Sequence, residues 1–201
     1  MTLYILAITV LISIAAFYNR ELMGRLIFNP YMINVRREWW RFFTCGFIHA
    51  DWLHLGVNML VLYSFGQAVE QYYGFVFEEK AVFYFLLLYL GGIVISITPS
   101  YKKHLHNPGY NALGASGAVA AILFTAILFD PLRPIYLYGL LGIPGIFLGV
   151  AYLVYSYYMD KKGNDHINHD AHFWGAVFGI VFTVALKPKI LLHFIDKLTQ
   201  F

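Results

Sequence analysis

Cysteine is almost absent from this chain of 201 residues, in which Cys45 stands alone. A single thiol excludes an intramolecular disulfide, so the fold must be held by packing rather than by covalent cross-links. Charge is also scarce, because only 12% of the residues are Asp, Glu, Lys or Arg, whereas 60% are hydrophobic. Together with a mean hydropathy of +0.62, this composition excludes an ordinary soluble domain and predicts a polytopic membrane protein.

Two further features are missing from the sequence, a basic nucleic-acid-binding stripe and a signal-peptide pattern. Lysine and arginine are scattered among short segments and form no basic stripe interleaved with aromatic residues, which argues against a nucleic-acid partner. The first 19 residues have neither a positively charged start nor a small-residue cleavage site. We therefore expect a retained first helix rather than a removed signal peptide.

Long apolar segments, separated by charged residues, are what the sequence does contain. These runs are continuous and do not alternate with period two, which favours helices over barrel strands. Six of them come near the roughly 20 residues that a helix needs to cross a bilayer. The sequence therefore predicts an all-α polytopic membrane protein with one domain over residues 1–201, in which six transmembrane helices occupy residues 2–18, 52–73, 81–98, 111–129, 135–159 and 169–187.

Two prolines refine these predicted boundaries. Pro99 is expected to end the third helix, because proline has no backbone donor and its ring clashes with the preceding turn. In the fifth helix, Pro144 lies close to Gly142 and Gly145, so we expect that helix to be kinked or irregular there.

About thirty residues separate the first two helices, and a connection of that length is usually functional in a compact domain. Five arginines and two glutamates are interleaved there with apolar residues, as expected of short amphipathic helices in the lipid headgroup region. Trp40 and Arg41 are expected to anchor this loop, because an indole N–H and a guanidinium can reach headgroups or backbone carbonyls.

A serine flanked by small residues is the first candidate for chemistry. Ser116 lies in an apolar segment between Gly114 and Gly117, where other groups can approach the backbone closely. Ala112 and Ala120 lie four residues to either side and extend this small-residue face. The pattern alone is more typical of helix packing, in which a serine bonds its own turn. A catalytic interpretation therefore requires a base elsewhere in the chain.

The histidine at the head of the last apolar segment is a candidate base. His172, Gly175 and Gly179 share one helical stripe, because they are separated by three and four residues. The two glycines remove side-chain bulk, so this helix can approach Ser116 until imidazole and hydroxyl are within hydrogen-bond reach. Such a base would raise the nucleophilicity of the serine hydroxyl.

Neither nearby aspartate is expected to complete a triad. Asp170 precedes His172 by two residues and points to another helix face, and Asp165 lies outside the apolar segment. The sequence therefore predicts a dyad of Ser116 and His172 without a third member.

Two polar residues at the start of the second helix are candidate oxyanion donors. His54 and Asn58 are four residues apart and share one face, at a depth where an amide needs a partner. As a structural pair they would join two helices. As a functional pair they would act with the Ser116 backbone N–H and donate hydrogen bonds to a developing oxyanion in a low dielectric.

These pieces, in this order and at this spacing, resemble the rhomboid intramembrane serine proteases over essentially the whole chain. The matching motifs are Trp40-Arg41 in the first loop, His49 with His54-x-x-x-Asn58, Gly114-x-Ser116-Gly117, and Ala171-His172-x-x-Gly175-x-x-x-Gly179.

The resemblance implies a rhomboid-like bundle of six helices, with an active site that opens to water just below the extracytoplasmic surface. Ser116 would be the nucleophile and His172 the general base. The oxyanion hole would consist of His54, Asn58 and the Ser116 backbone N–H. The other motif residues would support the site structurally: Trp40, Arg41, His49, Gly114, Gly117, Gly175 and Gly179.

The same resemblance implies the partners and the location. The substrate would be a transmembrane segment of another protein that enters laterally from the lipid bilayer past the fifth helix, and no metal or cofactor would take part. The compact size is typical of members in the bacterial cell membrane. The loops that this topology places outside hold nine of the 14 basic residues, so the orientation follows from the resemblance and not from the charges.

One position departs from the family pattern. Many bacterial rhomboids carry an aromatic residue four positions after the serine, packed against the histidine, whereas this chain has Ala120 there. Either another aromatic residue supports His172, or the dyad is looser.

Two other functions compete with this interpretation. A membrane metalloenzyme would use histidines at comparable spacing, and the candidates are His49, His54, His166, His169 and His172. Such a site would leave no role for a serine between glycines or for Asn58. The second alternative is a catalytically inactive rhomboid relative that binds membrane-protein clients, and the presence of both Ser116 and His172 counts against it.

Overall fold

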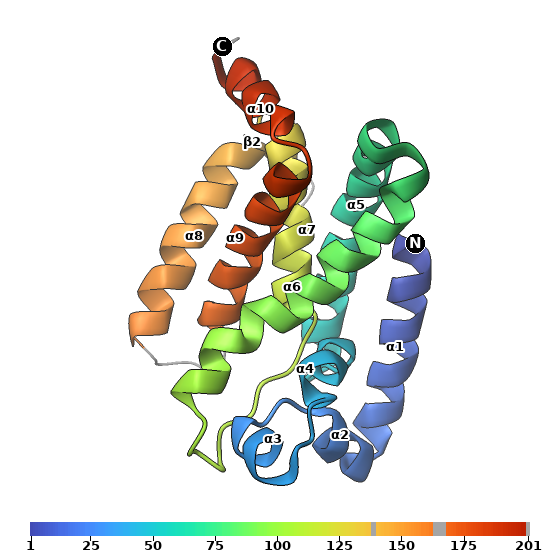
Figure 1. Cartoon of the computed structure of the whole chain (residues 1–201), viewed down its shortest axis with the longest axis vertical. Coiled ribbons are helices and arrows are strands. Elements are labelled where there is room, and N and C mark those ends of the chain that lie inside the picture. The colour runs from blue at the N-terminus through green and yellow to red at the C-terminus, as the bar shows by residue number, and fades with distance from the viewer. Residues whose placement is uncertain (138–139, 163–167, 200–201) are drawn as a thin grey trace.

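The computed structural model describes residues 1–137, 140–162 and 168–199, and most of them are helical. In chain order the elements are α1 (Thr2–Tyr18), α2 (Arg20–Leu26), α3 (Pro30–Arg36), α4 (Arg41–Thr44), η1 (Cys45–Phe47), α5 (Trp52–Phe77), η2 (Glu78–Lys80), α6 (Ala81–Lys103), α7 (Ser116–Phe129), β1 (Pro134–Leu137), β2 (Leu141–Pro144), α8 (Gly145–Lys162), α9 (His169–Leu186) and α10 (Lys189–Thr199). The short helices after α1 gather at one end of the bundle, and α10 lies at the other (Figure 1).

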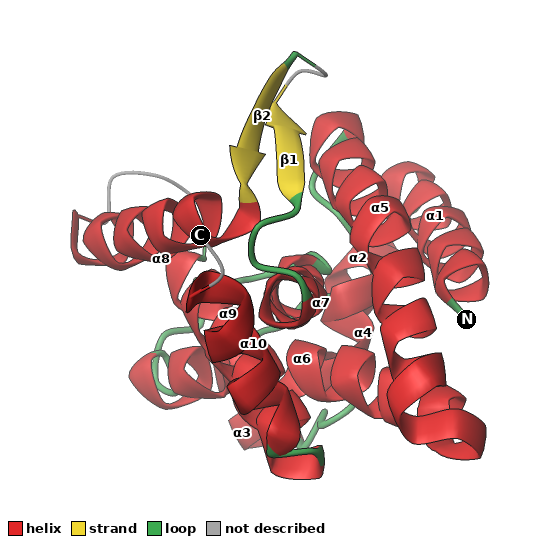
Figure 2. Ribbon diagram, turned by 90° about the horizontal axis from the view of Figure 1, so that it is seen from above, coloured by secondary structure: helices red, strands yellow, loops and turns green. Residues whose placement is uncertain are grey.

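Apart from α1, which packs against α5, the other long helices are arranged around α7 (Figure 2). Figure 2 shows α7 near the centre of the bundle, and it contacts α5, α6, α8 and α9. Apart from Ser116 and Thr125 its residues are apolar, and nearly every residue from Gly117 to Phe129 is buried. A helix with no polar face gains most when other helices cover it completely, which explains its central position.

The contact between α7 and α9 is the closest in the bundle. A β-carbon added to Gly175 would overlap the carbonyl oxygen of Gly117, and one added to Gly179 would overlap that of Ala121. The two helices therefore meet backbone to backbone, which only a residue without a side chain permits. The glycine stripe seen in the sequence marks this contact.

Arg41 fixes the segment that follows α1. The side chain is buried, and its guanidinium donates to the carbonyls of Gly24 and Ile27, each at 2.7 Å. An ion pair with Glu38 takes up a further donor, so the buried charge is satisfied. The neighbouring Trp40 is half exposed, and its indole N–H reaches a backbone carbonyl of α2 at 3.4 Å. Both residues thus bond backbone carbonyls, one of the two kinds of partner that the sequence suggested.

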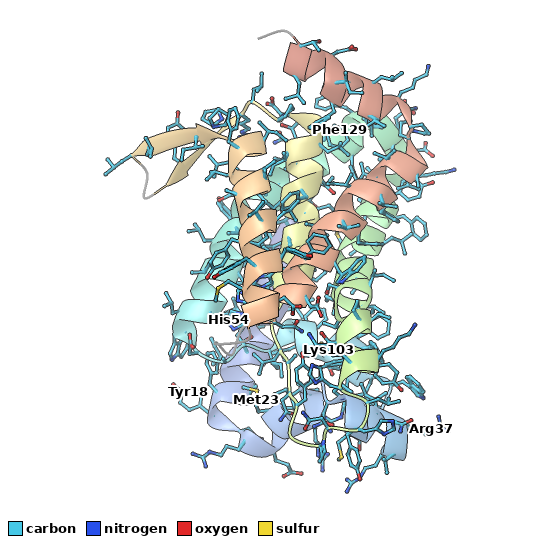
Figure 3. The ribbon with its side chains drawn as sticks, turned by 90° about the vertical axis from the view of Figure 1, so that its left-hand side faces the viewer. Tyr18, Met23, Arg37, His54, Lys103 and Phe129 are labelled. Atoms are coloured by element: carbon cyan, nitrogen blue, oxygen red, sulfur yellow. The ribbon has the colours of Figure 1, made fainter. Side chains whose placement is uncertain are left out.

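The predicted helix over residues 135–159 is wrong in its first part. Strands β1 and β2 form an antiparallel hairpin there, with Pro134 opposite Pro144, and α8 begins only at Gly145. A kinked helix was expected, but a short apolar run bounded by prolines is equally suited to a strand, and periodicity cannot distinguish the two. The hairpin projects sideways from the helices in Figure 3.

The predicted helix over residues 111–129 also begins too early, because α7 starts at Ser116. In the segment before it, Ala112 forms an isolated antiparallel bridge with Phe28 through two backbone hydrogen bonds of 3.0 Å. This bridge joins the chain before Ser116 to the first loop, which no local pattern could indicate.

Pro99 does not end its helix, since α6 continues to Lys103 instead of stopping at residue 98. Proline lacks one donor, but helix–helix packing tolerates that loss within an apolar bundle. The last helix, α10, was not predicted, because it contains no long apolar run. Its sequence mixes charged and apolar residues instead.

Within the part of the chain that the structure describes, two helical stretches are long and apolar enough to cross a membrane. By length and composition these are Trp52–Lys103, which contains α5, η2 and α6, and His169–Leu186, which is α9; α1 and α7 are apolar but shorter.

We predict that Gly179→Ala destabilises the protein. The added methyl group would overlap the carbonyl oxygen of Ala121, and overpacking of this kind costs about 1–3 kcal/mol. Thermal unfolding in detergent, followed by tryptophan fluorescence, measures the effect. Gly74→Ala in α5 is the matched control, because nothing lies within 4 Å of its added β-carbon and alanine favours a helix. Equal melting of Gly179→Ala and wild type would contradict the proposed contact.

Candidate active site

Ser116 is half-buried and is the first residue of α7. The turn before it depends on Gly114, whose φ of +115° is available to glycine but strained for other residues. A β-carbon at Gly114 would also lie 2.7 Å from Cε1 of His54. Glycine is therefore needed at this position for two reasons. It lets the chain turn into α7, and it leaves room for the His54 ring.

A small hollow opens beside Ser116. The residues that line it include Gly114, Ser116 and Gly117, Ser96 of α6, and Asn168 and Ala171 at the start of α9. A β-carbon at Gly117 would overlap the Ser96 hydroxyl, so this glycine too allows a close approach. The turn that carries the serine is thus enclosed by α6 on one side and α9 on the other.

His172 lies on α9, one turn before Gly175, and Gly175 rests on the backbone of Gly117. Because residues three apart lie on the same helix face, this contact brings the imidazole to the level of Ser116. The geometry therefore brings together the two helix ends that carry the predicted nucleophile and base.

The start of α9 is held by Asn168, which the sequence analysis did not single out. Its side-chain oxygen accepts the N–H of Ala171 at 3.1 Å and so caps the helix, and its amide donates to the Ser100 hydroxyl at 3.2 Å. Asparagine three residues before an apolar run is the sequence signal that could have revealed it. This bond fixes the turn of α9 that precedes His172.

An aromatic ring does support His172, but it comes from α8. The ring of Tyr152 stacks on the imidazole with centroids 5.8 Å apart and planes at 23°, while His169 contacts the imidazole edge-on. Ala120, at the position where an aromatic residue was expected, is buried within α7. Of the two possibilities raised by that departure, the structure favours the presence of another aromatic support.

His54 lies at the end of the bundle that also holds Lys103, opposite the end marked by Phe129 (Figure 3). The Ala50 N–H points to Nδ1 of His54 at 3.5 Å, which leaves the proton on Nε2, the ring nitrogen nearer to Gly114. Asn58 is buried, and one of its amide hydrogens bonds the His54 carbonyl at 2.9 Å. Its second amide hydrogen is not used in that bond.

His49 links the serine turn to α1. Its ring is fully buried, contacts the Ser13 hydroxyl through Nδ1 at 2.9 Å, and accepts the Ala115 N–H at Nε2, 3.4 Å away. Because Nε2 accepts, the proton lies on Nδ1, which donates to the Ser13 hydroxyl. That hydroxyl in turn donates to the Phe47 carbonyl. The residue before Ser116 is therefore fixed by a neutral imidazole.

Burial lowers the pKa of His49 to about 3, from an ordinary value of 6.5. Electrostatic repulsion from His54 lowers this pKa further. The carboxylate of Asp51 raises it and so opposes both effects. A charged His49 would also lose the hydrogen bond from Ala115, so the geometry and the pKa agree on the neutral form.

Of the two aspartates considered for a triad, only Asp170 lies within the described residues. Asp170 faces Lys103, 3.8 Å away, and the same ammonium lies 3.5 Å from Asp160 of α8. Asp165 and His166 lie outside the described residues. Within residues 1–137, 140–162 and 168–199, no group of three or more histidines, cysteines and carboxylates is placed to hold a metal ion.

We predict that stability falls as pH is lowered from the ordinary histidine pKa of 6.5 toward the folded-state value of about 3. In this window the unfolded chain binds a proton at His49 and the folded protein does not, so acid favours unfolding. Melting temperature measured against pH tests this. His49→Asn should be less stable at neutral pH and less sensitive to pH, whereas His106→Asn, at an exposed site, should follow wild type. A His49→Asn profile parallel to wild type would contradict a buried neutral ring.

Comparison with known proteins agrees with this arrangement. The family model described as the rhomboid domain matches residues 36–189. The mitochondrial RHOMBOID-like protein 12 of Arabidopsis thaliana is 31% identical over 149 residues, which are 69% of this chain and 44% of that protein. The rhomboid protease GluP of Bacillus subtilis is 38% identical over 94 residues, which are 45% of this chain and 16% of GluP.

The protein YdcA of Bacillus subtilis is 32% identical over 152 residues, which are 76% of this chain and 69% of YdcA. The chain spans about half of the length, or less, of RHOMBOID-like protein 12, GluP and the chloroplastic Rhomboid-like protein 11 of Arabidopsis thaliana. The matched region contains the turn before α7, the start of α9 and the polar residues of α5. On these grounds the chain belongs to the rhomboid family.

Proposed function

We propose that this chain is an intramembrane serine endopeptidase that cleaves transmembrane segments of other membrane proteins with a Ser116–His172 dyad. Rhomboid-family proteins are integral membrane proteins and are generally proteases, and this chain shares their domain. In this proposal α1, α5, α6, α7, α8 and α9 are the six transmembrane helices of a single domain.

One observation carries the proposal, namely the overlap that a side chain at Gly175 would make with the backbone of Gly117. Helix packing alone needs close contact somewhere along α9, but here the contact falls one turn from His172 and one residue from Ser116. Close approach at that level favours a reacting pair over a simple packing stripe.

In the proposed reaction, Ser116 Oγ attacks the carbonyl carbon of the scissile peptide while His172 removes its proton. The tetrahedral intermediate collapses, the peptide C–N bond breaks, and His172 gives the proton to the leaving amine. Water, activated by the same imidazole, then attacks the acyl-enzyme and releases the second product. The neutral imidazole is regenerated, so no net proton is consumed by the dyad.

The oxyanion would form at the N-terminus of α7. As the first residue of that helix, Ser116 has no carbonyl one turn earlier to bond, so its N–H is available and the helix dipole adds favourable charge. His54 Nε2 beside Gly114 and the second amide hydrogen of Asn58 would complete the site. Donors held in place before the reaction stabilise the developing charge without reorganisation.

The partners proposed here are a transmembrane protein substrate, which enters laterally past α8, and the lipid bilayer. The proposed chemistry needs no metal or cofactor, because serine, histidine and backbone donors supply the nucleophile, the base and the charge stabilisation. We place the protein in a bacterial cell membrane on the basis of its compact size.

Ser116→Ala and His172→Ala should each abolish proteolysis and labelling by a fluorophosphonate probe, because the first removes the nucleophile and the second its base. Labelling of detergent-solubilised protein, read on a gel, measures the effect. Ser64→Ala and His106→Ala are matched controls, since Ser64 bonds its own turn and His106 is exposed. Normal labelling of His172→Ala would disprove the dyad, and no labelling of a folded wild type would favour an inactive relative.

Asn58→Ala should lower the turnover number about 10–1000-fold, the usual effect of removing one oxyanion donor. Cleavage of a transmembrane reporter in proteoliposomes provides the measurement, with melting temperature as a check on folding. Gln67→Ala serves as the amide control on the same helix, because its side chain bonds its own turn. If both variants turned over at the wild-type rate, Asn58 would be a structural residue only.

A further inference from the structure

The imidazole of His172 needs help from its neighbours to keep one orientation. Rotation about the bond between Cβ and the ring is broad and nearly two-fold for histidine, so the backbone does not fix the ring plane. In this chain the ring of Tyr152 stacks on the imidazole with centroids 5.8 Å apart, and the ring of His169 lies nearly perpendicular to the imidazole at 81°. These two neighbouring rings restrict the plane of the imidazole.

Tyr152 reaches this position because of how α8 packs. Gly145, Gly149 and Tyr152 recur at intervals of four and three, so they lie on one face of α8. A β-carbon at Gly149 would lie 3.1 Å from Ile127 and 3.3 Å from Phe124, which places that face directly against α7. Phe124 also contacts the Tyr152 ring, with centroids 6.0 Å apart. The tyrosine ring thus contacts Phe124 of α7 while it stacks on His172.

The face of α7 that carries the serine offers no aromatic ring one turn after Ser116. Ala120 lies one turn after Ser116 on that face, and a methyl group cannot stack on an imidazole. We propose that Tyr152 is a positioning residue that holds the His172 ring in the plane required by Ser116, an inference that rests on the proposed Ser116–His172 dyad. The orientation of the base then depends on α8 as well as on α9.

This role predicts a result that simple packing does not. If Tyr152 only held α8 against the bundle, its removal would loosen α8, and a substrate helix or a small probe would reach Ser116 at least as fast as before. If it orients the base, its removal slows the reaction of Ser116 with both, because a misplaced catalytic group costs rate even where access improves.

The experiment compares wild type, Tyr152→Leu and Tyr152→Phe, with Phe147→Leu as the control at an exposed aromatic position of the same helix. Tyr152→Leu should react with fluorophosphonate about 10–100-fold more slowly, while Tyr152→Phe, which keeps the ring, should stay near wild type. With a reporter substrate the loss should appear in kcat and not in KM. A wild-type rate for Tyr152→Leu, or an equal loss in Tyr152→Phe, would overturn the proposal.

A second measurement separates this inference from the proposed function. Protons held over the face of a tyrosine ring resonate upfield, so the His172 ring protons should move downfield in Tyr152→Leu and remain in place in Phe147→Leu. NMR of histidine-labelled protein gives these shifts, and His172→Gln identifies the signal. If folded wild type neither cleaved nor labelled, the protease function would fail, and unchanged His172 shifts in Tyr152→Leu would independently overturn the positioning role.

Discussion

The backbone contact between α7 and α9 is the constraint on which the rest of the structure depends. Gly175 and Gly179 have no side chains, so α9 rests directly on the carbonyl groups of Gly117 and Ala121. Any larger residue at these two positions would push the helices apart, and with them the ends that carry the proposed Ser116–His172 dyad. In a membrane, where apolar residues gain little by leaving lipid, such close packing is also a main source of helix association.

Around this contact, the serine turn is fixed by groups that satisfy one another. Before α7, Ala112 forms a backbone bridge with Phe28. The Ala115 N–H donates to His49, which in turn bonds Ser13 of α1. Buried polar groups are costly unless paired, and here each partner also defines where Ser116 begins its helix. The turn that carries the proposed nucleophile is thus fixed before any substrate arrives, and it depends on a backbone conformation at Gly114 that would strain other residues.

The places where sequence-based prediction failed have a common cause. Residues 134–137 and 141–144 pair as antiparallel strands and do not start a helix, and α6 continues past Pro99. In both cases the apolar pattern was identified correctly, but in a lipid-like interior hydrophobicity alone does not distinguish strand from helix or set a helix end. The outcome depends on which backbone groups find partners in neighbouring elements, and a local window contains no information about them.

The sequence by itself determined the class of protein, the approximate helix positions and the residues of the proposed dyad, because composition, helical spacing and small-residue motifs are local properties. Only the tertiary structure decided that Tyr152 stacks on His172, that Asn168 ties α9 to α6, and that His49 bonds the residue before Ser116. Each of these contacts joins segments that are distant in the sequence. Whether they form depends on how the helices rotate and slide against one another, and that is set by the packing of the whole bundle.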